Sequence, residues 1–197
     1  MKYAKTELTR QHIIETTAPV FNKKGYAGTS MTDLTQATGL TTGALYAHFG
    51  NKENMAIAAL DHNIKRVSDM MAFAAAREKT MAGKLLMYVM TYHSATKLAG
   101  LNGGCPMQNA LTDADDTMEA LRKEAAIGLI DWKNDLVRII NAGIANGEFM
   151  ENEAGKTALH IIALIEFGFL MMSAQKSRAA MDEMVEMAAE VAKKIIK

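Results

Sequence analysis

The sequence predicts an all-α protein of about nine helices. The 197 residues include 16 Met and only 2 Pro, and residues that favour strands do not cluster. Apolar residues instead recur at three- and four-residue spacing, which is typical of amphipathic helices. The chain is also long enough to bury a sizeable core.

The first helix is expected over residues 6–24, where apolar residues follow helical spacing. Thr6 is a suitable N-cap, and Gly25 suits the position after the last turn. Pro19 lies inside this span and lacks a backbone N–H, so we expect a local kink without a break.

Two short helices are expected next. Ser30 opens the capping-box-like stretch "SMTD", and the helix that follows ends before Gly39. Thr41 is placed to cap a third helix that runs to residues 46–47 and stops near Gly50. Two helices joined by a turn of three or four residues have the spacing of a helix-turn-helix.

The start of the third helix suits an anion. Small residues at 41–44 allow close approach, and the amides of a first helical turn have no partner within the helix. In helix-turn-helix proteins the second helix of the motif enters the major groove. Leu45 and Phe49, four residues apart, are expected to face inward. The polar side chains suited to DNA contact are Thr41, Thr42, Tyr46, His48 and Lys52.

The remaining chain is also predicted to be helical. A loop rich in glycine interrupts it near residues 100–106. Helices are expected over residues 51–77, 80–99, 117–146, 152–173 and 178–196, with a short turn near 107–112.

Charge and cysteine content bound the environment. The formal net charge is zero, but residues 1–66 carry eight Lys and Arg against five acids, a weak sign of an anion-binding N-terminal part. One cysteine excludes an internal disulfide and fits a reducing cytoplasm. The apolar run at 161–172 is interrupted by Glu166 and is short for a bilayer, so we expect a cytoplasmic protein without a membrane partner.

Residues 21–55, "FNKKGYAGTSMTDLTQATGLTTGALYAHFGNKENM", strongly resemble the DNA-binding segment of the tetracycline-repressor (TetR) family of transcriptional regulators. The direct match covers about the first quarter of the chain, and the length and helix number agree with that family. The resemblance implies a DNA-binding domain at 1–50 and an effector-binding and dimerisation domain at 51–197. The matching positions are Phe21, Gly25, Tyr26, Thr29, Gly39, Gly43, Leu45, Tyr46, Phe49 and Lys52.

The resemblance also implies roles for single residues. Thr41 and Lys52 would bind the sugar-phosphate backbone, and His48 would reach a phosphate. Many relatives place Lys or Arg at position 42 and Ser or Thr at position 44, so this helix has fewer polar side chains than is usual. The candidate DNA-binding residues are Ser30, Thr41, Thr42, Gly43, Ala44, Tyr46, His48 and Lys52.

A sensor domain is implied from about residue 55. Methionines fall on segments expected to line a helical bundle, and thioethers adapt to irregular apolar shapes. Methionine at helical spacing is also typical of an ordinary core, and that alternative stays open. The candidate effector-binding residues are Met70, Phe73, Met87, Met90, His93, Met107 and Trp132.

Dimerisation is expected through the last two helices. Residues 158–175 are apolar almost all round, and residues 181–196 carry a clean apolar stripe. Pairing both across a two-fold axis would give a four-helix interface. The candidate interface residues are Ile161, Leu164, Ile165, Gly168, Met172, Met184, Met187, Val191 and Ile195.

The expected function is that of a homodimeric repressor, which a small and largely apolar effector releases from double-stranded operator DNA. The sequence shows no catalytic motif, no metal-ligand spacing and no cofactor site, so an enzyme is not expected. Two alternatives stay open. The protein could be a regulator that senses oxidants or electrophiles through Cys105, or a helical carrier of apolar molecules that binds no DNA.

Overall fold

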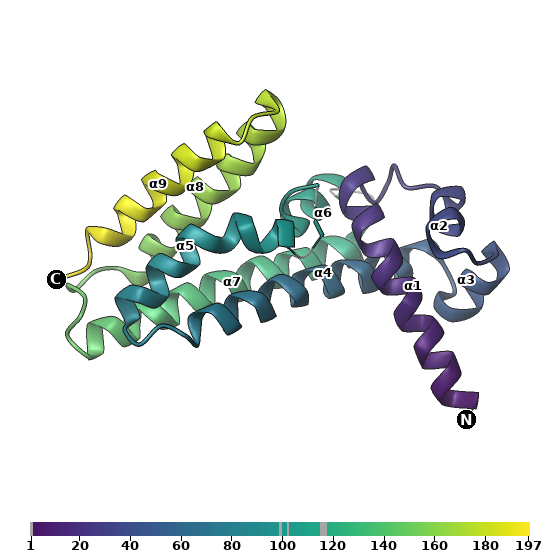
Figure 1. The fold of residues 1–197 in the computed structure, drawn as a ribbon, viewed down its shortest axis with the longest axis horizontal. Coiled ribbons are helices and arrows are strands. Elements are labelled where there is room, and N and C mark those ends of the chain that lie inside the picture. Colours follow the sequence, from purple (N-terminus) through teal and green to yellow (C-terminus); the bar gives the residue numbers. More distant parts are fainter. Residues whose placement is uncertain (1, 99, 102, 115–117) are drawn as a thin grey trace. The chain divides into compact units, whose positions relative to one another are not determined.

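The computed structural model describes residues 2–98, 100, 101, 103–114 and 118–197 (Figure 1). Within these residues the chain is helical, without strands, and has one isolated antiparallel bridge between Phe149 and Ile196. The all-α prediction is confirmed. The helices are α1 (Lys2–Lys24), α2 (Met31–Thr38), α3 (Thr42–Phe49), α4 (Lys52–Ala75), α5 (Met81–Leu98), α6 (Pro106–Ala114), α7 (Glu119–Ala145), α8 (Ala154–Gln175) and α9 (Ala179–Lys193).

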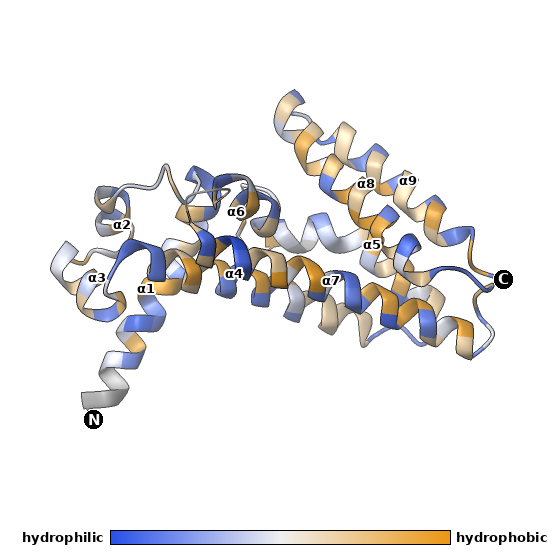
Figure 2. Ribbon diagram, turned by 180° about the vertical axis from the view of Figure 1, so that it is seen from behind, coloured by the Kyte–Doolittle hydropathy of each residue, from blue (hydrophilic) through white to orange (hydrophobic). Residues whose placement is uncertain are grey.

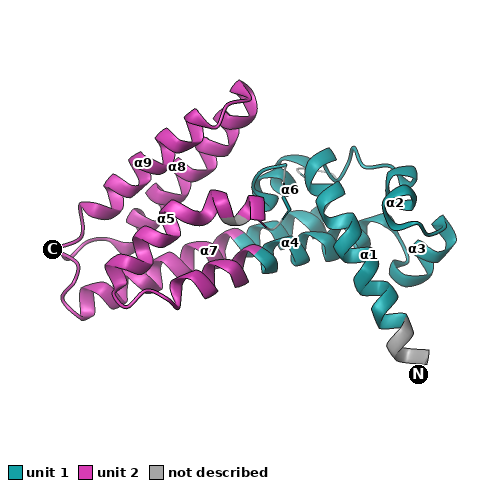
Figure 3. Cartoon of the chain, viewed as in Figure 1, with its two compact units in different colours: residues 1–66, 99–128 teal, residues 67–98, 129–197 magenta. Residues whose placement is uncertain are grey.

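The chain forms two compact units (Figure 3). The first comprises residues 1–66 and 99–128, and the second residues 67–98 and 129–197. Both α4 and α7 therefore contribute to each unit. These units are defined by packing, and the functional boundary between residues 50 and 51 stays a prediction.

Helix α1 begins earlier than predicted. It starts at Lys2, so Thr6 lies inside the helix and is not its N-cap, because residues 2–5 include no helix breaker. The helix runs through Pro19 without a break and ends before Gly25, whose φ of 81° is readily adopted only by glycine.

The caps of α2 and α3 agree with the prediction. The Ser30 hydroxyl accepts a hydrogen bond from the N–H of Asp33 at 3.1 Å, and the Ser30 N–H donates to the Asp33 carboxylate at 2.9 Å. The Thr41 hydroxyl accepts from the N–H of Ala44 at 3.2 Å. Gly39, at a φ of 69°, ends α2, so the helix-turn-helix is specified by residues close in sequence.

The core of the first unit joins α1, α2 and α3 to the start of α4. Phe21 and Tyr26 stack with ring centroids 5.4 Å apart, and both are fully buried. Leu34 of α2 and Leu45 of α3 are also fully buried in this core. Burying these side chains holds the two short helices in place, since neither is long enough to be stable alone.

The later helices keep the predicted order with shifted ends. The expected turn near 107–112 is a nine-residue helix, α6, which begins at Pro106, a residue suited to the first turn of a helix. The predicted start of α7 at Thr117 lies outside the described residues.

In the second unit α8 packs along α9. A Cβ at Gly168 would lie 2.5 Å from the Sδ of Met181 and 3.1 Å from the Cβ of Met184, so glycine permits close contact of the two helices. Figure 2 shows apolar residues along both helices. The backbone N–H of Met150 donates to the carbonyl of Ile195 at 2.8 Å, which ties the end of α9 to the turn before α8.

Helix α8 is the one helix in the described residues that meets length and composition criteria for crossing a membrane, with 33% of its apolar window buried. The 22-residue helix is longer than the apolar run at 161–172. The core helix of a soluble protein meets the same criteria, so this is weak support for a membrane span.

Candidate nucleic-acid interface

Helix α3 buries one face and exposes the other. Leu45 is fully buried and Phe49 is 6% exposed, as predicted. Thr42 and Gly43 are exposed, and Tyr46 keeps 39% of its surface accessible. The polar face of the short helix is therefore available to a partner.

Gly43 and Ala47 lie on the outward face. They are four residues apart and share one side of α3, offset by two residues, or about 200°, from the pair of buried side chains. Both are exposed, and Ala44 beside them is half-buried. Ala47 was not among the predicted site residues, although its four-residue spacing from Gly43 indicates that it lies on the same outward face.

The first turn of α3 presents backbone donors. The N–H of Ala44 is occupied by the Thr41 hydroxyl, and the N–H of Leu45 donates to the Thr41 carbonyl at 3.1 Å. The N–H groups of Thr42 and Gly43 precede the first intrahelical bond, and both residues are exposed. Such amides are suited to a phosphate oxygen.

Ser30 is exposed, and its side chain also forms part of the N-terminal cap of α2. Its hydroxyl donates to the Asp33 carboxylate at 2.8 Å and accepts from the Asp33 N–H, so the side chain is engaged in the cap of α2. The Lys24 ammonium, which hydrogen-bonds the Asp33 carboxylate, and then the Ser30 donors lower the pKa of Asp33 to about 2.

Lys52 begins α4 next to α3. Its ammonium donates to the carbonyl of Ala27 at 3.3 Å, and the side chain is half-buried. Asn51 caps α4 by accepting from the N–H of Asn54 at 2.7 Å, and the Asn54 amide donates to the carbonyl of Phe49 at 2.8 Å. These bonds join the end of α3 to the start of α4.

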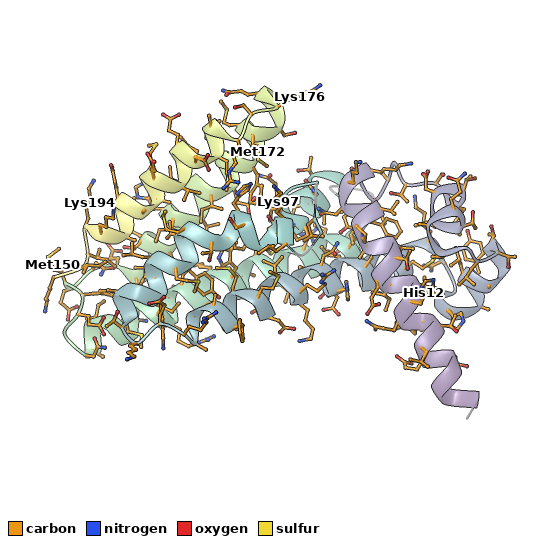
Figure 4. All side chains as sticks on the ribbon, in the orientation of Figure 1. His12, Lys97, Met150, Met172, Lys176 and Lys194 are labelled. Atoms are coloured by element: carbon orange, nitrogen blue, oxygen red, sulfur yellow. The ribbon has the colours of Figure 1, made fainter. Side chains whose placement is uncertain are left out.

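Two histidines and an arginine lie in or beside the helix-turn-helix. His48 is half-buried in the last turn of α3. His12 of α1, marked in Figure 4, has its Nε2 3.2 Å from the carbonyl oxygen of Thr38. The Arg10 guanidinium lies 4.9 Å from the ring centre of Phe49, which sequence reasoning also missed because no local spacing links them.

The candidate effector residues are only partly brought together. In the second unit Tyr92 and Trp132 stack with centroids 4.0 Å apart, and Phe169 meets Tyr92 edge-on at 6.2 Å. His93 lies 5.9 Å from the same phenylalanine, and burial, with a smaller effect of Arg178, lowers the pKa of His93. Met70 and Met87 are half-buried.

Three of these candidates lie elsewhere. Phe73 is 70% exposed and Met90 53% exposed, so Met90 does not line the interior of the isolated chain as expected, and contact of either residue with an effector stays a prediction. Both occupy outward positions of their helices. Met107 belongs to the first unit, where a Cβ at Gly128 would lie 3.1 Å from its Sδ.

The candidate dimer residues also divide into buried and partly exposed side chains. Ile161 and Ile165 are buried, and Gly168 faces Met181 of the same chain. These three positions therefore do not offer a surface to a second copy, because the chain itself already covers them. Leu164, Met172, Met184 and Val191 are half-buried, Met187 is 44% exposed, and Ile195 is 9% exposed.

A different face of α8 is open. It carries an apolar stripe that repeats at intervals of four, four and three residues. We call it the α8 stripe, and its residues are Leu159, Ala163, Phe167 and Leu170. Three of them, Leu159, Phe167 and Leu170, are 51%, 49% and 55% exposed.

Cys105 is fully buried directly before α6. A thiol that senses oxidants or electrophiles must be accessible, so this burial speaks against the redox alternative. Within the described part of the chain, no three His, Cys, Asp or Glu side chains form a group that could hold a metal ion.

Two family models match the chain. The model described as "Bacterial regulatory proteins, tetR family" covers residues 13–59. The model described as "Tetracyclin repressor-like, C-terminal domain" covers residues 82–188, which is more than half of the chain.

Similar proteins agree with these matches. The structure of a TetR-family transcriptional regulator from Cytophaga hutchinsonii is 44% identical, with a TM-score of 0.91 over 98% of this chain and 96% of that one. The structure of a TetR transcriptional regulator from Chloroflexus aurantiacus is 29% identical, with a TM-score of 0.90 over 98% of each chain.

A shorter match is found to the HTH-type transcriptional regulator TtgR of Pseudomonas putida. It is 39% identical over 70 residues, which are 36% of this chain and 33% of the relative. The chain thus aligns with about a third of the length of this relative. With both family models and a 44% identical structure along nearly the whole chain, the protein belongs to the TetR family of bacterial transcriptional regulators.

Proposed function

We propose that the protein is a homodimeric, cytoplasmic repressor that binds operator DNA through α3 and is released by a small, largely apolar effector. Residues 1–50 would bind DNA, and residues 51–197 would bind the effector and form the dimer. The observation that carries the proposal is the exposed, Thr41-capped start of α3, with Leu45 and Phe49 buried beneath it. This arrangement fits a helix that enters the major groove.

Contacts to DNA divide between backbone and bases. The N–H groups of Thr42 and Gly43, the Thr41 hydroxyl and the Lys52 ammonium suit phosphate oxygens. Thr42, Ala44 and Tyr46 are proposed to reach the bases. Two copies would occupy half-sites about one DNA turn apart, roughly 34–36 Å.

The α8 stripe is proposed to form the dimer with α9. Its apolar residues recur at intervals that keep them on one side of the helix, as in a four-helix interface. Across a two-fold axis the same stripe meets itself, which closes the assembly. Met184, Met187 and Val191 are proposed to extend this surface on α9.

The effector is proposed to bind in the second unit near Trp132. The side chain of Trp132 is 6% exposed, and its Nε1 has no hydrogen-bond partner among the described residues. A buried donor among aromatic rings suits a ligand that is mainly apolar and carries one acceptor. His93 and Met87 are proposed to contribute to the same site.

Two measurements test the proposal. Fluorescence anisotropy with labelled DNA from the region upstream of the protein's own gene should show saturable binding with a steep dependence on salt. Trp132 is the single tryptophan, so its fluorescence reports on the second unit during titration with a panel of apolar compounds. A compound that changes this signal should weaken DNA binding, and DNA should weaken its binding by the same factor.

Failure to bind any upstream DNA at low salt would favour the helical carrier instead. A compound that binds the protein without altering DNA affinity would remove it from the list of effectors.

A further inference from the structure

The recognition helix lacks the side chains that make bidentate contacts with purines. The sequence of α3 is TGALYAHF, without Arg, Lys, Asn or Gln. Arg and Lys make bidentate contacts with guanine, and Asn and Gln make them with adenine. Helix α3 therefore has no group for these contacts.

The outward line of α3 consists of small residues. Gly43 and Ala47 are exposed at its centre, and Ala44 borders them. A Cβ at Gly43 would find no atom of the chain nearer than the Thr41 Oγ1 at 4.0 Å, so packing within the chain does not require glycine there. Small residues on this line let the helix backbone come close to the floor of the groove.

Beside the exposed side chain of Tyr46, methyl groups are the main chemistry that this surface offers to bases. Ala44, Ala47 and Thr42 each carry one methyl group on or beside the exposed face. The C5-methyl of thymine is the apolar group in the major groove, and alanine and threonine methyls contact it. Apolar surface of α3 would thus be buried against thymine.

We infer that α3 recognises its half-site through the C5-methyl groups of thymines that contact Thr42, Ala44 and Ala47. This inference rests on the proposed function, since it concerns the DNA that the repressor binds. It adds Ala47 to the specificity-determining residues.

The neighbouring polar groups are accounted for separately. Gln36, an exposed amide in the motif, belongs to α2, the helix that in this motif crosses the DNA backbone. His48 and Lys52 are suited to phosphates, and phosphate contacts carry no direct sequence information.

The experiment uses operator duplexes in which single thymidines are replaced by deoxyuridine, which lacks the C5-methyl group. Each replacement at a contacted position should weaken binding about three- to five-fold, the value expected for one buried methyl group. Replacement in the flanks outside the protected region is the control and should leave the dissociation constant unchanged.

Protein variants connect the effect to single residues. Thr42→Ser keeps the hydroxyl of residue 42 and removes its methyl group. Ala47→Gly removes the methyl group that residue 47 is proposed to place against a second thymine. Each variant should bind equally well to operators with thymine or uracil at the base that its substituted residue contacts. Replacing the thymine contacted by the other residue should still weaken binding. Far-UV circular dichroism confirms that the variants are folded.

The outcomes separate the two claims. Absence of any operator binding by the wild-type protein would overturn the proposed function and this inference with it. Tight binding that is insensitive to uracil at every position would overturn the inference alone.

Discussion

The carboxylate of Asp113 in α6 accepts a hydrogen bond from the backbone N–H of Tyr26, in the turn that joins α1 to α2. The same oxygen accepts from the N–H of Ala27 at 3.3 Å. The carbonyl of Ala27 in turn accepts from Lys52. The turn that precedes the helix-turn-helix is therefore held on one side by α6 and on the other by the start of α4.

A second set of polar contacts supports this attachment. The Asn22 amide donates to the carbonyl of Gly104 at 3.1 Å, and the Asn109 amide donates to the carbonyls of Asn22 and Gly103 at 3.1 and 2.9 Å. A Cβ at Gly103 would overlap the carbonyl oxygen of Asn22, so the loop before α6 touches α1 closely. Helix α6 thus packs as part of the first unit.

Asp113→Ala should destabilise the first unit and weaken operator binding. The variant leaves the N–H of Tyr26 without its acceptor in a half-buried turn, and such a loss costs about 1–3 kcal/mol. Urea unfolding followed by far-UV circular dichroism measures the free energy of unfolding. Thr112→Ala on the same helix is the control, since Thr112 is exposed and its hydroxyl donates to the carbonyl of Gln108 in α6. Equal unfolding midpoints for the two variants would contradict this role of Asp113.

Gly43→Ala should raise stability and lower DNA affinity. Alanine in place of glycine within a helix stabilises it by up to about 1 kcal/mol, and the chain leaves the added methyl group room. The same methyl group would stand between α3 and the groove. Thermal unfolding measures the expected gain in stability, and fluorescence anisotropy measures the expected loss of DNA affinity. Unchanged DNA affinity would show that Gly43 does not approach the duplex.

Lys52→Ala should lower the salt dependence of operator binding. Removal of one phosphate contact decreases the slope of log K against log salt by about 0.9 per protomer. Sequence preference should stay the same, because phosphate contacts do not distinguish bases. Lys156→Ala, in the second unit, is the charge-matched control. A slope equal to that of the wild type would remove Lys52 from the phosphate-binding residues.

Stability should fall in acid partly through Asp33. The pKa of Asp33 in the folded chain is about 2, below the value of about 3.9 for an unfolded chain. The unfolded state therefore binds more protons over this range, and stability present above about pH 4 is lost as the pH falls towards 2. Asp33→Asn should flatten this limb of the curve in urea titrations.

Lys24→Ala supplies a matched test of the same pair. Without the ammonium the pKa of Asp33 should move up towards its ordinary value, so the acid limb becomes shallower in this variant as well. An acid limb identical to that of the wild type in both variants would assign it to other groups.

Phe167→Glu should dissociate the proposed dimer and abolish high-affinity operator binding. A charge in the α8 stripe would meet its symmetry copy across the two-fold axis and would be buried at a high cost. Light scattering after size-exclusion chromatography measures the mass. Ile130→Glu is the control, because Ile130 is 55% exposed on α7 and lies outside the stripe. A dimer that persists in Phe167→Glu would place the interface elsewhere.

The sequence by itself determined the helix-turn-helix. The cap bonds of Ser30, Thr41 and Gly39 join residues no more than four positions apart. Local spacing was therefore enough to predict these caps. The inward side of α3 followed from the same periodicity. The early start of α1 was missed because an N-cap residue is also tolerated inside a helix.

Tertiary structure alone decided which side of α8 is covered. Residues 158–175 are apolar almost all round, and only the packing of α8 against its neighbouring helices buries Ile161 and Ile165 and leaves Phe167 exposed. The bond between Asp113 and Tyr26 joins residues 87 positions apart, and nothing in the spacing of either indicates the other. Contacts between distant segments depend on how the helices pack, and helical periodicity does not contain that information.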